Sequence, residues 1–210
     1  MWKTHKKTVI LTFILILLPI AVGLLLWDRL PPEIPTHFGA NNQPDGWSSK
    51  AFAVFALPGI MAGIHLLCVL CTNIDPKKDN ITPKIMTVVL WFVPILSWIV
   101  MGIVYFYALG RTPDVDVITS LMVGLLLIIV GNYLPKVKQN YTVGIKVSWA
   151  LNDEENWRHT HRFGGYVFII AGILVAVLDL LLCLWAVIAV VLIAALAPTL
   201  YSYLYYRKHN

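Results

Sequence analysis

The chain has 210 residues, of which 59% are hydrophobic and only 13% are charged, and its mean hydropathy is +0.75. A soluble domain carries about 25% charged residues, so this composition excludes an ordinary water-soluble protein and predicts an integral membrane protein. The net charge of +5 would suggest nucleic-acid binding in a soluble protein. Here it indicates basic loops on the cytoplasmic side of a membrane.

Six apolar stretches are predicted to cross the bilayer, because a spanning helix needs about 20 apolar residues. The N-terminal stretch is too long for a signal peptide and is interpreted as a retained helix. The last stretch, Phe163–Tyr206, is too long for one helix and is predicted to fold back near Asp179, which creates spans five and six. The first four predicted spans are Thr8–Trp27, Ala51–Thr72, Lys84–Leu109 and Val117–Leu134.

The distribution of basic residues predicts the orientation of these spans. An even number of spans places both termini on one side, and 13 of the 16 Lys and Arg residues fall in segments on that side. Basic loops remain in the cytoplasm, so both termini are predicted to be cytoplasmic. The predicted fold is an all-α integral membrane protein with six transmembrane helices, an extended outer loop (Asp28–Lys50) and a larger inner loop (Pro135–Arg162).

The outer loop is rich in proline and contains the turn sequence Pro44-Asp45-Gly46, so it is predicted to be extended and turned rather than helical. His37 is a candidate metal ligand or general base. A zinc site needs three or four ligands, however, and the acidic residues of the loop follow no metal-binding spacing. We therefore favour a structured loop in which His37 packs against Phe38 or hydrogen-bonds the backbone.

The inner loop contains NYTVGIKVSW, which is predicted to be extended, and then ALNDEENWRHTHRF, which is predicted to begin a helix. Asn152 is the predicted N-cap, with Glu155 closing a capping box. His159 and His161 would point about 200° apart on that helix, so one metal ion cannot join them. The sequence shows no zincin, nucleophile-elbow or phosphate-loop motif, and no catalytic residue, metal or cofactor is predicted.

His65 is the ionisable side chain that the sequence places well inside a span. Such a residue marks a transport pathway in some membrane proteins, whereas in others it hydrogen-bonds a neighbouring helix. We favour the hydrogen bond. A small membrane transporter or a membrane-embedded enzyme remains the alternative function.

Both loops carry motifs that resemble the SdpI family of bacterial immunity proteins and its N-terminal domain of unknown function. LPPEIPTHFGANNQPDGWSSK (Leu30–Lys50) resembles the family pattern L-P-x-x-I-P-x-H-F…G-x-P-D-G…S-K. GNYLPKVKQNYTVGIKVSWALNDEENWRHTHRFGG (Gly131–Gly165) is similar to G-N-x-L…N…G-I-R-T-P-W-T-L…E…W…T-H-R…G. Lys146 stands where the family often has arginine, and lysine gives up bidentate recognition of a carboxylate or phosphate.

The resemblance implies a non-enzymatic protein of the bacterial plasma membrane. It implies protection against a secreted, membrane-active peptide toxin at the outer face, and signalling by a transcriptional repressor held at the inner face. Membrane lipid is a further expected partner, and direct contact with nucleic acid is not expected. The two matches lie in different three-span halves, residues 1–116 and 117–210.

The resemblance also implies the residues of two sites. The expected toxin-facing residues are His37, Phe38, Asp45 and Trp47. The residues expected to dock a cytoplasmic partner are Asn132, Asn140, Gly144, Lys146, Trp149, Trp157, Arg158, His161 and Arg162.

Overall fold

The computed structural model describes residues 2–39, 42–178 and 184–209, which form two compact units. The first unit comprises Met1–Ile74 and Met86–Val115, and the second comprises Asp75–Ile85 and Asp116–Asn210. The second unit therefore includes a short connection from the N-terminal part of the chain, a feature that the sequence did not suggest.

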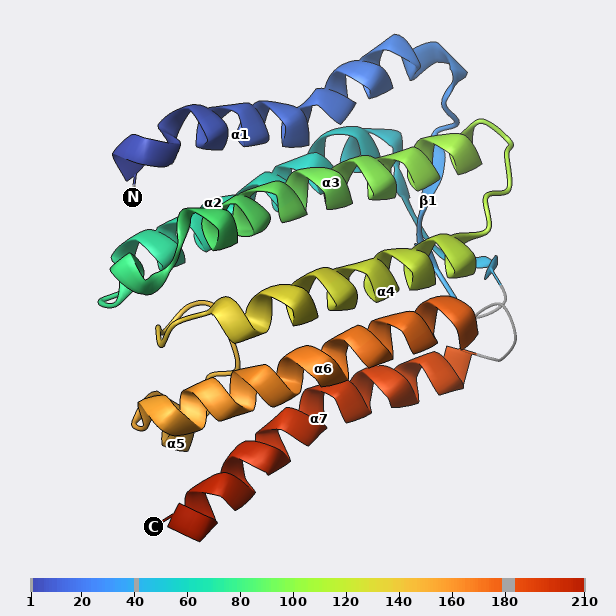
Figure 1. Ribbon diagram of the computed structural model, residues 1–210. Helices are drawn as coiled ribbons and strands as arrows, with labels where there is room; N and C mark the ends of the chain where they lie inside the picture. The colour runs from blue at the N-terminus through green and yellow to red at the C-terminus, as the bar shows by residue number, and fades with distance from the viewer. Residues whose placement is uncertain (1, 40–41, 179–183, 210) are drawn as a thin grey trace. The chain divides into compact units, whose positions relative to one another are not determined.

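Within the described residues, six helices are long and apolar enough to cross a membrane, which confirms the predicted spans (Figure 1). The fifth helix begins earlier than predicted, because the helix expected in the inner loop runs on into the fifth span. Asp179, the predicted turning point, lies outside the described residues. The helices are α1 (Trp2–Leu25), α2 (Leu57–Ile74), α3 (Pro83–Ala108), α4 (Val115–Tyr133), α6 (Glu154–Leu178) and α7 (Leu184–His209).

Several short elements connect these helices. The π-helical turn η3 (Phe52–Ala56) extends the N-terminal end of α2, so the second span runs over Phe52–Ile74. The remaining elements are η1 (Trp27–Arg29), η4 (Lys78–Asn80), η5 (Leu134–Lys136) and α5 (Ser148–Leu151).

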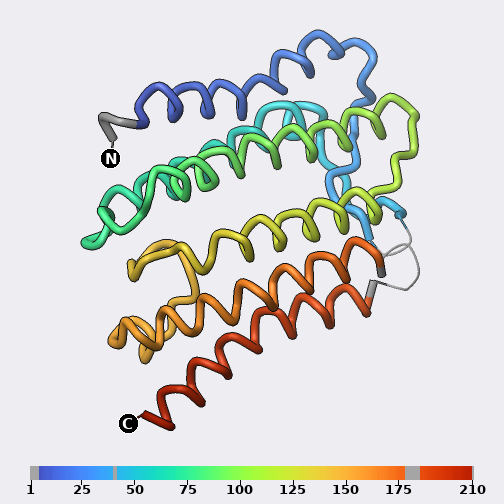
Figure 2. The backbone as a smooth tube through the Cα atoms, in the orientation of Figure 1, coloured from blue at the N-terminus to red at the C-terminus, as the bar shows by residue number. Residues whose placement is uncertain are grey.

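The bend of α1, visible in Figure 2, is stabilised by side chains of α3. Pro19 lies inside α1 and lacks the amide hydrogen that would bind the carbonyl of Leu15. Trp98 replaces that donor, because its Nε1 donates to the Leu15 oxygen at 3.0 Å. An open carbonyl in hydrocarbon costs several kcal/mol, so these bonds fix the pairing of α1 with α3. Two further donors are Ser97 Oγ to Ile16 O (3.1 Å) and the Tyr105 hydroxyl to Pro19 O (2.8 Å).

Trp98→Phe removes the donor to Leu15 and keeps most of the ring. We expect it to lower the free energy of unfolding by about 1–2 kcal/mol, because the Leu15 carbonyl is left without a donor in the hydrocarbon. Thermal unfolding in detergent measures this change. Trp185→Phe is the matched control, since Trp185 is 75% exposed. Equal melting temperatures for the two variants would show that the Leu15 carbonyl does not need Trp98.

An antiparallel β-hairpin lies between α1 and η3, and consists of β1 (Glu33–Phe38) and β2 (Pro44–Ser49). The predicted extended and turned loop is thus a paired two-stranded sheet within an otherwise helical fold. Its buried side joins the core of the first unit, where Leu30 and Ile34 pack with Val54 and Met101.

Polar anchors fix the hairpin at its base and near its turn. Lys50 Nζ donates to the carbonyls of Trp27 (3.0 Å) and Leu30 (3.2 Å), and lies 4.7 Å from the centre of the Trp27 ring. Asn42 Nδ2 donates to Pro113 O at 3.1 Å, and Asn42 Oδ1 accepts from the amide of Val115 at 2.7 Å. Asn42 therefore caps the first residue of α4.

In the second unit, α4 and α6 meet at two pairs of glycines. Gly124 faces Gly172, and Gly131 faces Gly165. A Cβ atom on Gly172 would lie 2.5 Å from the Gly124 oxygen, and one on Gly131 would lie 2.7 Å from the Gly165 oxygen. The two backbones therefore touch without intervening side chains, as in other membrane helix pairs with small residues at the contact.

Candidate functional site

One face of the hairpin is exposed, because side chains alternate between the two faces of a β-strand. The exposed residues are Glu33, His37, Asp45, Trp47 and Ser49. Three of the four predicted toxin-facing residues, His37, Asp45 and Trp47, thus share one surface. Phe38 does not belong to it, because its ring packs edge-to-face on Tyr107 of α3, with 5.2 Å between the ring centres.

His37 and Asp45 form a pair across the two strands, with 2.5 Å between Nδ1 and Oδ1. This contact corrects the prediction that His37 packs against Phe38 or hydrogen-bonds the backbone. Two glycines leave room for the pair: a Cβ on Gly46 would lie 2.8 Å from His37 Cβ, and one on Gly39 would lie 2.7 Å from Asp45 Oδ2. Both side chains remain exposed, at 73% for His37 and 53% for Asp45.

Trp47 extends the same surface with an apolar ring that is 55% exposed. The hairpin thus presents a rigid polar pair beside a large aromatic side chain, a combination that suits recognition of an amphipathic ligand. Among the described residues, no group of three or more His, Cys, Asp or Glu side chains is placed to hold a metal ion.

The segment between α4 and α6 folds around Trp157, which is only 2% exposed. The Trp157 indole donates to Val137 O at 2.8 Å and stacks on the His161 ring with 4.0 Å between the centres. His161 Nε2 accepts from the amide of Ile145 at 3.0 Å, and Nδ1 lies 2.8 Å from Trp157 O. An acceptor at Nε2 and a donor at Nδ1 define the neutral imidazole.

Gly144 completes this packing because its φ of +121° places it in a backbone region that side chains rarely adopt. A Cβ at this position would overlap His161 Nε2 and lie 3.2 Å from the ring of Trp157. The glycine is therefore required where the loop crosses the Trp157–His161 stack.

The side chain of Asn140 folds residues 138–143 into a turn. Its Oδ1 accepts from the amides of Thr142 (2.8 Å) and Val143 (2.6 Å), and its Nδ2 donates to the carbonyls of Lys138 (2.8 Å) and Val143 (3.0 Å). The prediction that this stretch is extended was wrong. The local side-chain bonds of asparagine outcompete an extended backbone here.

The start of α6 is also capped differently from the prediction. Asp153 Oδ1, rather than Asn152, accepts from the amides of Glu155 (2.8 Å) and Asn156 (3.2 Å). Glu155 does not close a capping box. Its carboxylate faces Arg158 at 3.6 Å and His159 at 3.8 Å on the next turn.

Burial divides the residues expected to dock a partner into two sets. Asn140, Trp157 and His161 are at most 2% exposed. They form the interior of the segment, so the prediction that their side chains line a docking surface is corrected. Trp149 is half-buried against Tyr203. Gly144 packs against the stacked rings of Trp157 and His161. The exposed members of the set are Asn132, Lys146, Arg158 and Arg162.

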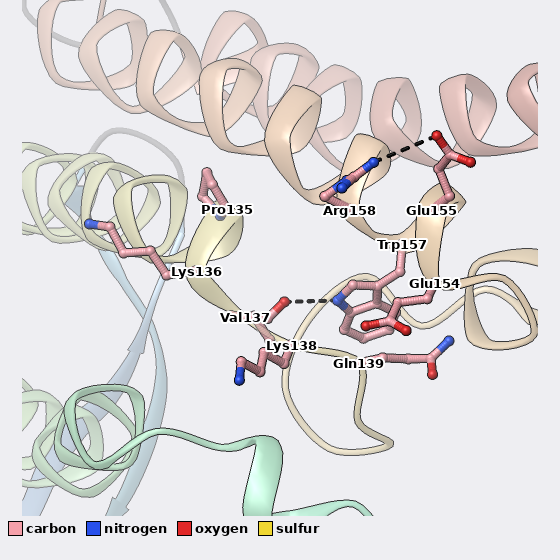
Figure 3. Close-up of a pocket in the computed structure, with 9 residues that line it drawn as sticks. All are labelled: Pro135, Lys136, Val137, Lys138, Gln139, Glu154, Glu155, Trp157 and Arg158. Carbon is pink, nitrogen blue, oxygen red and sulfur yellow. Dashed lines mark hydrogen bonds and ion pairs between the residues drawn. The ribbon is translucent and has the colours of Figure 1, made fainter.

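A polar pocket of about 600 Å³ opens beside this buried interior. Figure 3 shows Trp157 at its centre, with Lys136 and Lys138 on one wall and the Arg158–Glu155 pair on the other. The remaining lining residues are Pro135, Val137, Gln139 and Glu154. The pocket thus presents positively and negatively charged side chains, with the ring of Trp157 between them.

A buried polar cluster between α6 and α7 was missed by sequence reasoning. Asn156 Nδ2 donates to Ser202 O at 3.1 Å, and Asn156 Oδ1 accepts from Ser202 Oγ (2.7 Å) and Thr160 Oγ1 (2.9 Å). All three residues are fully buried. The available signal was Asn156 and Thr160 at i and i+4, which share one face of a helix.

His65 has the structural role that the sequence favoured. It is fully buried, and its Nε2 lies 3.0 Å from Thr12 Oγ1 on α1. Since the Thr12 hydroxyl donates to Val9 O at 2.9 Å, the imidazole is the donor in the contact with Thr12. The predicted hydrogen bond to a neighbouring helix is confirmed.

The described residues contain six helices long and apolar enough to cross a membrane, a hairpin after the first and a folded polar segment after the fourth. This arrangement is that of a multi-pass membrane protein. Residues 136–202 match the SdpI/YfhL protein family, and residues 14–62 match the domain of unknown function DUF1648. The chain is 29% identical to "Immunity protein SdpI" of Bacillus subtilis (strain 168), over 98% of each chain. The resemblance seen in the two loops is confirmed. No solved structure matches the chain significantly.

Proposed function

We propose that this protein is a membrane immunity protein that protects its cell against a secreted, membrane-active peptide toxin, and that it is not an enzyme. The observation that carries this proposal is the relation to an immunity protein over 98% of both chains. A relation of this extent includes the hairpin, the spans and the polar segment together. The alternative of a transporter has less support, because His65 already serves to join α2 to α1.

The exposed face of the hairpin is the proposed toxin-binding surface, on the outer side of the membrane. Trp47 supplies an exposed aromatic anchor, and the His37–Asp45 pair supplies directional polar groups beside it. Buried aromatic anchors dominate many binding surfaces. The uneven distribution of Lys and Arg residues among the segments favours the same orientation, with both termini in the cytoplasm.

Trp47→Ala should weaken protection about tenfold or more, because loss of an aromatic anchor typically costs 2 kcal/mol or more of binding free energy. The measurement is survival of a toxin-sensitive host that expresses each variant at equal level. Ser49→Ala, on the same face, is the matched control. Wild-type protein that gives no survival gain would refute the immunity function, whereas full protection by Trp47→Ala would refute only the hairpin surface.

We further propose a signalling role, in which the segment between α4 and α6 holds a transcriptional repressor at the inner face while toxin is present. The supporting observation is that the basic residues Lys146 of this segment and Arg158 and Arg162 in the first turns of α6 are exposed. Exposed basic residues suit an acidic region of a cytoplasmic protein.

Arg158→Gln combined with Arg162→Gln should abolish recruitment of a fluorescently tagged repressor and leave toxin protection intact. Both side chains are exposed, so the fold should tolerate the change. Microscopy of the tagged repressor, with and without toxin, measures recruitment. A double variant that still recruits the repressor would exclude these arginines from the docking surface.

A further inference from the structure

The connection between α2 and α3 contacts the polar segment between α4 and α6. Asp75 directly follows α2 and is only 4% exposed. Its Oδ2 accepts from the amide of Tyr141 at 2.9 Å and from the hydroxyl of Thr142 at 2.6 Å, and its Oδ1 accepts from the amide of Lys77 at 2.7 Å. One buried carboxylate therefore joins this connection to the turn that Asn140 folds.

Gln139 forms a second set of bonds to the same connection. Lys77 Nζ donates to Gln139 Oε1, and Asn80 Nδ2 donates to Gln139 O at 2.7 Å. The other end of the Gln139 amide donates to the carbonyls of Ala150 (3.2 Å) and Leu151 (2.9 Å). Gln139, which also lines the polar pocket, thus bridges the connection and α5.

One side of these contacts lies outside both family matches. The matches cover residues 14–62 and 136–202, whereas the connection Asp75–Ile85 lies between them and belongs to the second unit. Burial by itself would raise the pKa of Asp75. The Thr142 hydroxyl and the amides of Lys77 and Tyr141 outweigh that effect, so the pKa lies below its usual range. The buried carboxylate is thus held ionised by its donors.

We propose that Asp75 is a positioning residue for the docking surface of the second unit, and that the α2–α3 connection is part of that surface. Lys77 Nζ lies 5.6 Å from the centre of the Tyr141 ring, and that ring is 49% exposed. The half-buried Lys77 and the exposed ring of Tyr141 therefore place a cation beside an aromatic side chain where the two segments meet. Its partner is an acidic region of a cytoplasmic protein, so this part of the inference rests on the proposed signalling role.

Helix α2 connects the hairpin to Asp75, so we expect it to take part in signalling. The chain passes from β2 through Lys50 and η3 into α2, and α2 ends at Ile74 immediately before Asp75. One helix, α2, therefore connects the hairpin to Asp75, and Asp75 is hydrogen-bonded to the turn at Asn140. Loss of the Asp75 contact should disconnect the docking surface from that helix and leave the hairpin intact.

Asp75→Asn tests the positioning role, because it keeps the shape of the side chain and replaces one acceptor oxygen with a donor. We expect the Tyr141 amide to exchange with deuterium about tenfold or more faster, since a hydrogen bond to a charged group is lost. Amides within α6 should be unchanged. Asp79→Asn is the matched control, because Asp79 is exposed on the same connection. Wild-type exchange in Asp75→Asn would overturn the proposal.

A second variant keeps the test decisive if Asp75→Asn also loses protection in α6. Thr142→Val removes one donor to Asp75 and keeps the carboxylate. It should accelerate exchange at Tyr141 by a smaller factor, and unchanged exchange there would overturn the proposal.

The pH dependence supplies a readout that simple loss of packing would not change. A carboxyl whose pKa is lower in the folded state stabilises above its unfolded pKa and loses that effect as the pH falls through the folded pKa. Protection at Tyr141, corrected for intrinsic exchange, should therefore persist from neutral pH down to the usual pKa range of carboxyl groups and be lost only below that range. Lys77 and Tyr141, the other titratable groups here, remain in Asp75→Asn, so this pH dependence should vanish in that variant.

Recruitment and protection assays connect the contact to function. Asp75→Asn should lose repressor recruitment and retain toxin survival, whereas Asp79→Asn should retain both. Recruitment that persists in Asp75→Asn despite faster exchange at Tyr141 would refute the effect on docking. Absence of recruitment by the wild-type protein would instead refute the signalling role, and the exchange result would still decide the positioning role.

Discussion

Gly144→Ala should unfold the polar segment between α4 and α6 and lower the free energy of unfolding by about 3 kcal/mol or more. Two costs combine in this estimate. A positive φ at a residue with a side chain costs about 1–3 kcal/mol, and overpacking costs a similar amount. The new methyl group would overlap His161 Nε2 and lie 3.2 Å from the ring of Trp157. Thermal unfolding followed by tryptophan fluorescence measures the loss.

Gly110→Ala separates the two costs. Gly110 also has a positive φ, of +79°, but nothing lies within 4 Å of a Cβ at that position. It should therefore show the backbone cost without the collision. Equal destabilisation by both substitutions would mean that the Trp157–His161 stack tolerates a methyl group at residue 144.

Gly172→Ala should force α6 away from α4 and destabilise the second unit by about 1–3 kcal/mol. The added methyl group would lie 2.5 Å from the Gly124 oxygen and 2.8 Å from a side-chain carbon of Ile128. Backbone atoms cannot rotate away as a flexible side chain can, so the helices themselves must move. Unfolding in detergent or in a denaturant series gives the size of the effect.

Gly102→Ala provides the comparison for a glycine inside a membrane helix. Nothing lies within 4 Å of a Cβ at residue 102, and alanine is about 1 kcal/mol better than glycine in a helix interior. This variant should therefore be neutral or stabilising. If Gly172→Ala behaves in the same way, the close approach of α4 and α6 does not contribute to stability.

The spans and the extended character of the loop after α1 could be predicted because both depend on local sequence. Hydropathy over about 20 residues identifies a spanning helix regardless of its neighbours. The prolines of the 28–50 loop likewise act on the residues beside them, and β1 and β2 form where helix was excluded. The pairing of His37 with Asp45 was harder to foresee, because it depends on the register of the two strands.

The candidate site was less predictable because its contacts join distant parts of the chain. Asp75 hydrogen-bonds Tyr141 and Thr142, more than 60 positions later in the chain. No local sequence pattern predicts such a contact. Trp157 illustrates a related difficulty. A tryptophan in a polar, charged stretch is expected at the surface. The Trp157 indole is instead buried, with Gly144 and His161 packed against it. The exposed residues of the expected set, Asn132, Lys146, Arg158 and Arg162, kept their expected position.

The bend at Pro19 has a consequence for how the protein is made. The carbonyls of Leu15, Ile16 and Pro19 obtain donors from residues 97, 98 and 105. The first span therefore leaves the ribosome some 80 residues before the side chains that complete it. Until the third span arrives, the Leu15 carbonyl, which has no amide donor at Pro19, needs water or the insertion machinery as a temporary donor. We therefore expect a chain interrupted after the second span to be less stable in the membrane than one that includes the third span.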